Sequence, residues 1–254
     1  MTEPELPLVE RTGVVAGDPV SFRERDTALG ALTAVRAEGL APLLRAVPVG
    51  DAHALTHLVP SDAVELAALR DRVPLRPGHV VTVLVAVLGA LEALHRAHLA
   101  HGGVDADRVL VAPDGAAVLA GSGLGWSVPP GAPGGPDPAD DLAAVAVLAR
   151  RLLGPGSAPP ALVVALLRAA HPDPAQRPDA ASLAAAVSAA LPAEPLLDLL
   201  WLAEPPPRRD LHPVQVADQP AEPAEHPIRP AHDPGQEQVT VPVATRRRGP
   251  VPRP

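Results

Sequence analysis

Three histidines and three aspartates lie between residues 91 and 125, and such side chains bind metals or transfer protons. His98 and His101 are three residues apart, but no His-Glu-x-x-His pattern accompanies them, so we do not predict a metal site. Ser122 stands in a Gly-Ser-Gly sequence that lacks the spacing of a Gly-x-Ser-x-Gly nucleophile elbow. We therefore predict no serine nucleophile.

The elements that position these residues follow from the local pattern. Leucines recur on one helical face up to Leu99, and His101-Gly102-Gly103 then ends the helix. Two β-prone runs follow, Val109–Val111 and Val118–Ala120, and Pro113-Asp114-Gly115 between them has the composition of a tight turn. The stretch is therefore predicted as helix, loop, strand, turn and strand.

This layout resembles the catalytic segment of bacterial Ser/Thr protein kinases, where a Leu-His pair, a His-Arg-Asp loop, a hairpin and an Asp-Phe-Gly sequence follow one another. The matching residues are Leu94-His95, His101, Val109-Leu110, Asp114-Gly115 and Gly123. The resemblance implies an α+β, protein kinase-like fold, with a truncated small lobe (residues 1–60) and a mainly α-helical large lobe (residues 61–204).

The residues that the family uses for phosphoryl transfer are replaced in this chain. Gly103 stands in place of the catalytic-loop Asp, and Asp105 in place of the loop Lys. Arg108 replaces the metal-binding Asn, and Gly121 replaces the Asp of Asp-Phe-Gly, which is the main magnesium ligand. Phosphoryl transfer depends on positioned metal ions and on a carboxylate that orients the nucleophile, so these positions are degenerate.

Lysine is absent, because all 21 residues counted as Lys or Arg are arginines. Protein kinases pair a strand Lys with the ATP phosphates and with a helix Glu. Arg does not replace it equally, since its planar fork is not a compact point charge. The resemblance therefore implies neither ATP nor magnesium as a cofactor.

The residues before the central segment are predicted to form the reduced small lobe. Residues 1–21 show no strong pattern, so its first strands should be short or missing. Residues 22–38 have helical spacing, and the runs 40–49 and 53–59 indicate antiparallel strands around the turn Gly50-Asp51. A short helix over residues 62–69 and a long one from about His79 to His98 should follow.

Two later motifs extend the resemblance, and a Pro/Gly-rich segment over residues 125–140, predicted as a mobile loop, precedes them. Asp141 opens a helical run; the matching family Asp accepts hydrogen bonds from the backbone around the loop histidine, here His101. An N-cap role for Asp141 is the alternative. Arg177 belongs to a Asp-Pro-x-x-Arg-Pro motif, and the Glu that pairs with this Arg in the family is missing. His101, Asp141 and Arg177 are therefore expected to be structural.

Composition sets the remaining limits. The chain is 47% hydrophobic but only 1% aromatic, which predicts an aliphatic core, and it contains no cysteine for a disulfide or a thiol nucleophile. A net charge of −8 argues against nucleic acid as the main partner. Neither a targeting segment nor a membrane span is predicted, so we expect a cytoplasmic protein.

The composition changes after residue 204. Residues 205–254 are rich in proline and poor in large apolar side chains, which predicts a disordered tail. Arg246, Arg247 and Arg248 near its end suggest weak contact with an acidic surface, and Thr240 and Thr245 are candidate phosphorylation sites.

The sequence thus predicts a pseudokinase, a catalytically inactive kinase homologue that binds or regulates an unidentified protein partner. The alternative is a divergent Ser/Thr kinase or nucleotide-binding sensor, in which Asp105 or Asp107 holds a metal or acts as the base.

Overall fold

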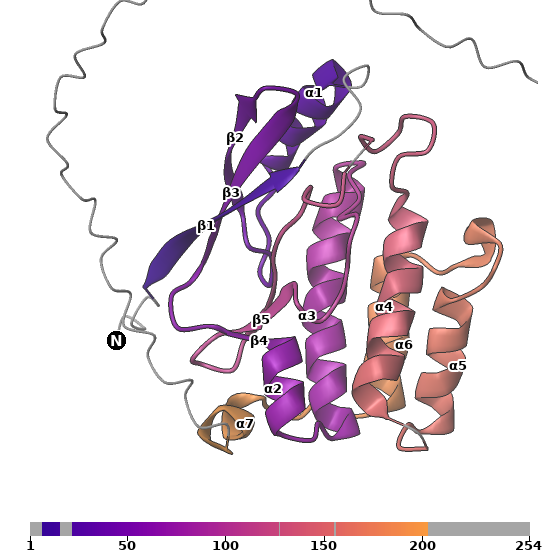
Figure 1. Cartoon of the computed structure of the whole chain (residues 1–254). Coiled ribbons are helices and arrows are strands. Elements are labelled where there is room, and N and C mark those ends of the chain that lie inside the picture. The colour runs from indigo at the N-terminus through magenta and orange to yellow at the C-terminus, as the bar shows by residue number, and fades with distance from the viewer. Residues whose placement is uncertain (1–6, 16–21, 127, 155, 203–254) are drawn as a thin grey trace, which may run out of the picture. The chain divides into compact units, whose positions relative to one another are not determined.

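A computed structural model describes residues 7–15, 22–126, 128–154 and 156–202. Their helices and strands, drawn in Figure 1, are β1 (Leu8–Val15), α1 (Phe22–Leu32), β2 (Leu43–Val49), β3 (Ala52–Pro60), β4 (Val64–Glu65), α2 (Leu66–Arg72), α3 (Pro77–Arg96), β5 (Val109–Val111), β6 (Ala117–Leu119), α4 (Pro138–Leu153), α5 (Pro160–Ala169), the 3₁₀ helix η2 (Pro174–Gln176), α6 (Ala180–Ala190) and α7 (Leu197–Leu202). The predicted α+β class is confirmed.

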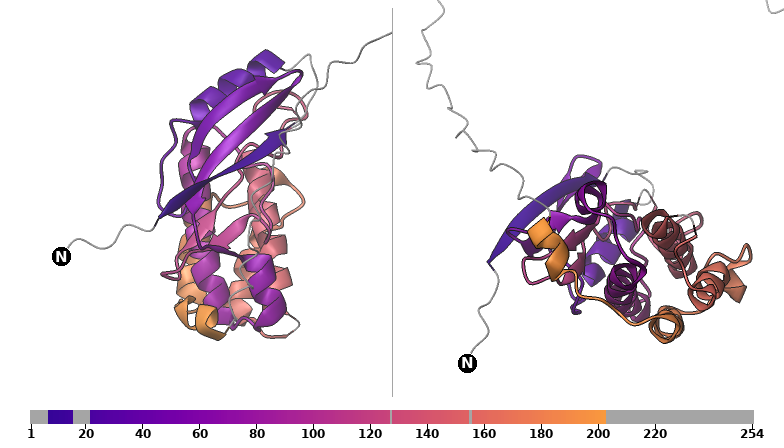
Figure 2. Two further views of the ribbon diagram at one scale, coloured as in Figure 1. Left: turned by 60° about the vertical axis from the view of Figure 1, so that its left-hand side comes forward. Right: turned by 90° about the horizontal axis from the view of Figure 1, so that it is seen from below.

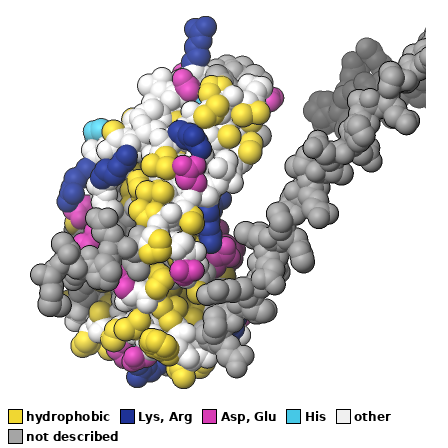
Figure 3. All heavy atoms as spheres, turned by 90° about the vertical axis from the view of Figure 1, so that its left-hand side faces the viewer, with side chains coloured by type: hydrophobic (Ala, Val, Ile, Leu, Met, Phe, Trp, Pro, Cys, Tyr) yellow, Lys and Arg dark blue, Asp and Glu magenta, His cyan; other side chains and the backbone are white. Residues whose placement is uncertain are grey.

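The first sheet is antiparallel, with strand order β1-β3-β2. The predicted hairpin of β2 and β3 is present, and Gly50 takes a φ of 64° in its turn. Strand β1 was not predicted, because only Val15 of its eight side chains is buried and no apolar alternation marks it. Exposed ion pairs cross this region, including Arg45 with Glu10, and Figure 3 shows a face where charged and hydrophobic side chains are interspersed.

Helix α1 ends at Leu32, six residues before the predicted end. The hydroxyl of Thr33 donates to the carbonyl of Gly30, and the Arg36 guanidinium donates to the carbonyls of Thr33 and Val35. These side chains satisfy carbonyls that further helical turns would otherwise use. The helix is fixed to the sheet by Arg25, which is buried and donates to the carbonyl of Asp51.

Helix α3 forms the centre of the core, and eleven of its twenty residues are buried. It is long and apolar enough to cross a membrane, but 61% of its apolar window is buried within the fold, as in the core helix of a folded domain. It ends at Arg96, slightly before the predicted end, because His98 has the left-handed φ of 57°. Figures 1 and 2 show α3 beside α4 and α6, with the first sheet and α1 at one end of the helices.

The second sheet has the order β4-β5-β6, and its β5–β6 hairpin lies where it was predicted. Asp114 accepts a hydrogen bond from the amide of Ala116, and Gly115 has a φ of 85°, as the Pro-Asp-Gly turn predicted. The helix predicted over residues 62–69 instead begins at Leu66, because Val64 and Glu65 pair with β5.

The segment predicted as a mobile loop contains a fixed residue. Trp126 is fully buried and its Nε1–H donates to the carbonyl of Ala100 at 3.0 Å, so this start of the segment is anchored. Helix α4 begins after the N-cap Asp137, whose carboxylate accepts from Ala139 N. The alternative that Asp141 is the N-cap is therefore wrong, and Asp141 lies inside the first turn.

The described residues group into one compact unit, with no division at the predicted lobe boundary at residue 60. The predictions for the tail, including Thr240, Thr245 and Arg246 to Arg248, lie outside the described residues.

Candidate functional site

The site is built around Asp141, a carboxylate with 2% of its surface exposed. Its Oδ2 accepts hydrogen bonds from His101 N at 2.7 Å and from His95 Nε2 at 3.0 Å, and its Oδ1 accepts from Gly102 N at 3.0 Å. The two backbone contacts are those that the resemblance implied. Three donors offset the loss of water around the buried carboxylate, so Asp141 fixes the end of the α3 connection against α4.

His101 extends this connection to the segment after β6. Its ring is fully buried, and Nε2 lies 3.0 Å from the carbonyl oxygen of Ala120. A carbonyl only accepts, so Nε2 carries the proton, while Nδ1 has no hydrogen-bond partner. Burial lowers the pKa of His101 to about 4, although the Asp141 carboxylate acts in the opposite direction. The imidazole is therefore neutral at pH 7, and it is a structural donor.

Arg108 lies between Gly103 and Gly121. Its Nη1 donates to the carbonyl oxygen of Gly121 at 2.9 Å. A Cβ at Gly103 would lie 3.5 Å from the Arg108 Cζ, and one at Gly121 would lie 3.1 Å from Nη1. A Cβ at Gly103 would make an ordinary contact with the guanidinium, whereas one at Gly121 would crowd it. Gly121 also has a φ of 79°.

A third basic side chain reaches the same segment from β3. His57 is 2% exposed, and its Nε2 lies 3.0 Å from the carbonyl oxygen of Ser122. Burial is the main reason that its pKa lies below 6.5, and the nearby Arg108 lowers the pKa further. We call His57, His101 and Arg108 the basic cluster. Its three members bind three consecutive carbonyls, those of Ala120, Gly121 and Ser122.

The residues that follow fill the space between this segment and the first sheet. A Cβ at Gly123 would lie 3.1 to 3.3 Å from side-chain carbons of Leu29, Leu32 and Leu55, so its backbone packs directly on α1 and β3. A Cβ at Gly13 in β1 would lie 2.8 Å from Leu124 Cδ2. Leu124 therefore occupies the space between β1 and Gly121.

The two acidic candidates, Asp105 and Asp107, lie in the loop before β5 and differ in exposure and contacts. Asp105 Oδ1 accepts from the amides of Asp107 and Arg108 at 3.0 and 3.1 Å, which stabilises the loop itself. Asp107 is exposed. Across residues 7–15, 22–126, 128–154 and 156–202, no group of three or more His, Asp or Glu side chains is placed to hold a metal ion.

Arg177 forms an ion pair with Asp140. It donates to Asp140 Oδ1 at 3.0 Å and to the carbonyls of Ala139 and His171. It therefore ties the segment before η2 to the first turn of α4, next to Asp141. Arg177 thus contacts the two residues that precede Asp141 in α4, but it does not belong to the basic cluster.

The structure brings the predicted residues His101, Asp141, Gly103, Arg108 and Gly121 into one region, and it adds His57 and Leu124, which were not predicted. A signal for His57 existed. Residues 53, 55, 57 and 59 alternate along β3, and all four are buried, so the histidine had to face inwards. Leu124 carried no such signal, because its contact with Gly13 depends on an unpredicted strand.

Comparison with family models and with curated proteins finds no match to this chain.

Proposed function

We propose that this protein has a kinase-like fold with a degenerate site, and that it acts as a pseudokinase, a protein-binding or regulatory module without phosphoryl-transfer activity. The proposal joins the motif resemblance to the geometry around Ala120–Ser122. The protein partner would be engaged by the surface of a stable scaffold rather than by an active site.

The observation that carries the proposal is the position of Arg108. In the resemblance, Gly103 and Gly121 replace the two aspartates that orient the nucleophile and bind magnesium. The Arg108 guanidinium lies against both glycines and donates to the carbonyl of Gly121. A permanent cation at this place repels magnesium, and it leaves no carboxylate to hold the ion.

Two further observations support the proposal. Leu124 lies between β1 and Gly121, where bound nucleotide phosphates would need space in a kinase. The chain also has no lysine to pair with those phosphates. The alternative, a divergent kinase, depends on Asp105 or Asp107 as the base or the metal ligand. This alternative is weakened because the Asp105 carboxylate already accepts hydrogen bonds from the amides of its own loop.

Thermal unfolding of the full chain, with and without excess magnesium and ATP, tests the proposal. A ligand at about 100 times its dissociation constant stabilises a protein by about 2.7 kcal/mol. For a domain of this size that free energy raises Tm by about 5 to 10 °C. We expect no shift in the wild type.

The variant Arg108→Asn is the matched measurement, because it removes the cation and restores the amide of the family position. An unchanged wild-type Tm, with no phosphate released or transferred, agrees with a pseudokinase. A magnesium-dependent rise in the Tm of the wild type would contradict the proposal and favour the nucleotide sensor. Loss of that rise in Asp105→Ala or Asp107→Ala would then identify the metal ligand.

A further inference from the structure

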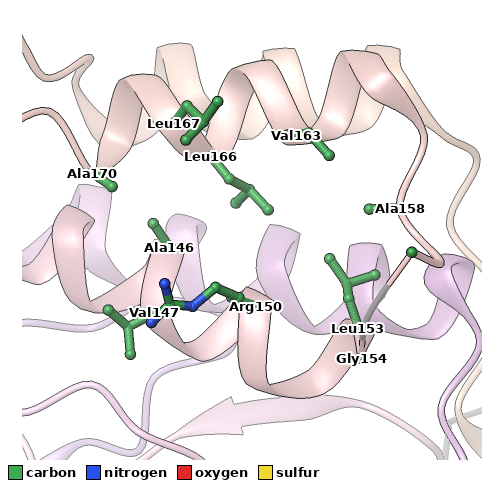
Figure 4. A pocket seen from close by; sticks show the side chains of 11 residues that line it. Ala146, Val147, Arg150, Leu153, Gly154, Ala158, Val163, Leu166, Leu167 and Ala170 are labelled. Carbon is green, nitrogen blue, oxygen red and sulfur yellow. The ribbon is translucent and has the colours of Figure 1, made fainter.

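A groove lies between α4 and α5, and none of its lining residues belongs to the basic cluster. Its volume is about 370 Å³, within the range of ligand pockets. Figure 4 shows the side chains of Leu166 and Val163 reaching from α5 towards Ala146 and Leu153 on α4.

The groove is apolar and open to solvent. Apart from Arg150, every residue that lines it is Ala, Val, Leu or Gly. Three of its apolar side chains are exposed: Val147 at 38%, Val163 at 39% and Leu167 at 66%. Exposed apolar side chains gathered around a hollow mark surfaces that bind a partner.

The positive charge around the groove indicates which kind of partner it would bind. Residues 142–172 contain three arginines and no Asp or Glu, although the whole chain has a net charge of −8. Arg150 lines the groove, while Arg151 and Arg168 directly follow the lining residues Arg150 and Leu167. Among the described residues, none of these three guanidinium groups has a hydrogen-bond or ion-pair partner. A local excess of unpaired positive charge complements an acidic partner.

The geometry points to this groove as the docking site for an amphipathic helix of a partner protein, with an apolar face and an Asp or Glu that pairs with Arg150. An apolar channel between two helices accepts such a helix through side chains at positions i, i+3 or i+4, and i+7. A carboxylate at the edge of that face would form a charge-assisted pair with the guanidinium. A concave groove favours a helix over a flat membrane surface. This inference rests on the proposed function, since it locates the surface that a protein-binding module would use.

The test begins with a phage-displayed library of random helical peptides, selected on the full chain. Peptides enriched on the wild type should carry the apolar spacing and at least one Asp or Glu. Their affinity, measured by fluorescence anisotropy, should fall at least about tenfold in Leu167→Asp and in Arg150→Glu. Exchanging the peptide's acid for Lys should recover binding to Arg150→Glu.

Each variant has a matched control in the chain. Val164 lies on the same helix and is 49% exposed but does not line the groove, so Val164→Asp should bind like the wild type. Arg23 on α1 is exposed and distant in sequence, so Arg23→Glu should also leave binding unchanged. All of these positions are exposed, so we expect the variants to fold. Melting temperatures equal to that of the wild type would confirm this.

Two results would overturn the inference. One is a set of enriched peptides that bind Leu167→Asp and Arg150→Glu as tightly as the wild type. The other is the absence of any enriched peptide; Leu167-dependent binding to phosphatidylserine vesicles would then assign the surface to a membrane. Neither result bears on the basic cluster, whereas a magnesium-ATP shift would overturn the pseudokinase proposal and leave the groove untouched.

Discussion

The guanidinium of Arg108 donates a hydrogen bond to the carbonyl of Gly121, thirteen residues further along the chain. The same guanidinium also packs against the Cα of Gly121, on the side where another residue would carry its Cβ. A Cβ at Gly121 would lie 3.1 Å from Arg108 Nη1, closer than an ordinary van der Waals contact, so the guanidinium would have to shift. The two positions therefore depend on each other, and changing one should affect the other.

Gly121→Ala tests this dependence. The new Cβ would meet Arg108 at 3.1 Å, and the φ of 79° is unfavourable for alanine. Gly50→Ala is the control, because Gly50 also has a positive φ but no heavy atom within 4 Å of the new Cβ. We expect Gly50→Ala to lower the free energy of unfolding by about 1 to 2 kcal/mol, and Gly121→Ala by about 1 kcal/mol more through loss of the Arg108 bond. Urea unfolding measures both, and equal losses would argue against the coupling.

Asp141→Asn should destabilise the fold strongly. The amide NH₂ of Asn cannot accept, so at least one of the bonds from His101 N, Gly102 N and His95 must break. We expect a loss of about 3 kcal/mol or more in the free energy of unfolding. Asp140→Asn, next in sequence but 63% exposed and paired with Arg177, should cost less than about 1 kcal/mol. Denaturant unfolding compares the two variants, and similar losses would contradict the role of Asp141.

Stability should fall as the pH drops below 6.5. An unfolded His101 binds a proton near its ordinary pKa of 6.5, whereas in the folded protein that pKa is about 4. Between these values the unfolded state binds more protons, so lower pH favours unfolding. The contribution lost at pH 5 is about 2 kcal/mol relative to pH 7. His57 and His79, whose pKa values are also lowered mainly by burial, act in the same direction.

The variant His101→Gln isolates this effect, because Gln retains an N–H donor but does not titrate. Urea unfolding at pH 7 and pH 5 should show a weaker pH dependence in the variant than in the wild type. Parallel curves would mean that His101 is protonated equally in both states.

The two tryptophans should report opposite environments. Trp126 is fully buried and hydrogen-bonded to Ala100, whereas Trp201 in α7 is 83% exposed. The variant Trp201→Phe should therefore emit at shorter wavelength and resist quenching by iodide, and Trp126→Phe should emit at longer wavelength and be quenched readily. Equal quenching in the two single-tryptophan variants would show that the start of the 125–140 segment is mobile, as its composition predicted.

The sequence predicted those parts of the fold that are determined by residues close together in the chain. The leucine periodicity predicted α3, and Pro113-Asp114-Gly115 predicted the turn between β5 and β6. Strand β1 has no such cause, since its stability comes from pairing with β3, whose partner residues are 38 to 52 positions away in sequence.

The same distinction applies to the site. The sequence placed a cation at Arg108 and glycines at two acidic positions, but the acceptor of Arg108 is a backbone carbonyl that no residue type reveals. The anchoring of Trp126 was missed because proline and glycine around it predict a loop, whereas the contact depends on the path of the chain near Ala100.

The three carbonyls bound by the basic cluster have a mechanical consequence. Ala120, Gly121 and Ser122 are held by side chains from the α3–β5 connection and from β3, so the segment cannot rotate about one peptide without breaking bonds to both. The segment is therefore a rigid connection between these elements and not a hinge. A ligand that binds elsewhere on the surface should therefore leave the conformation of this segment unchanged.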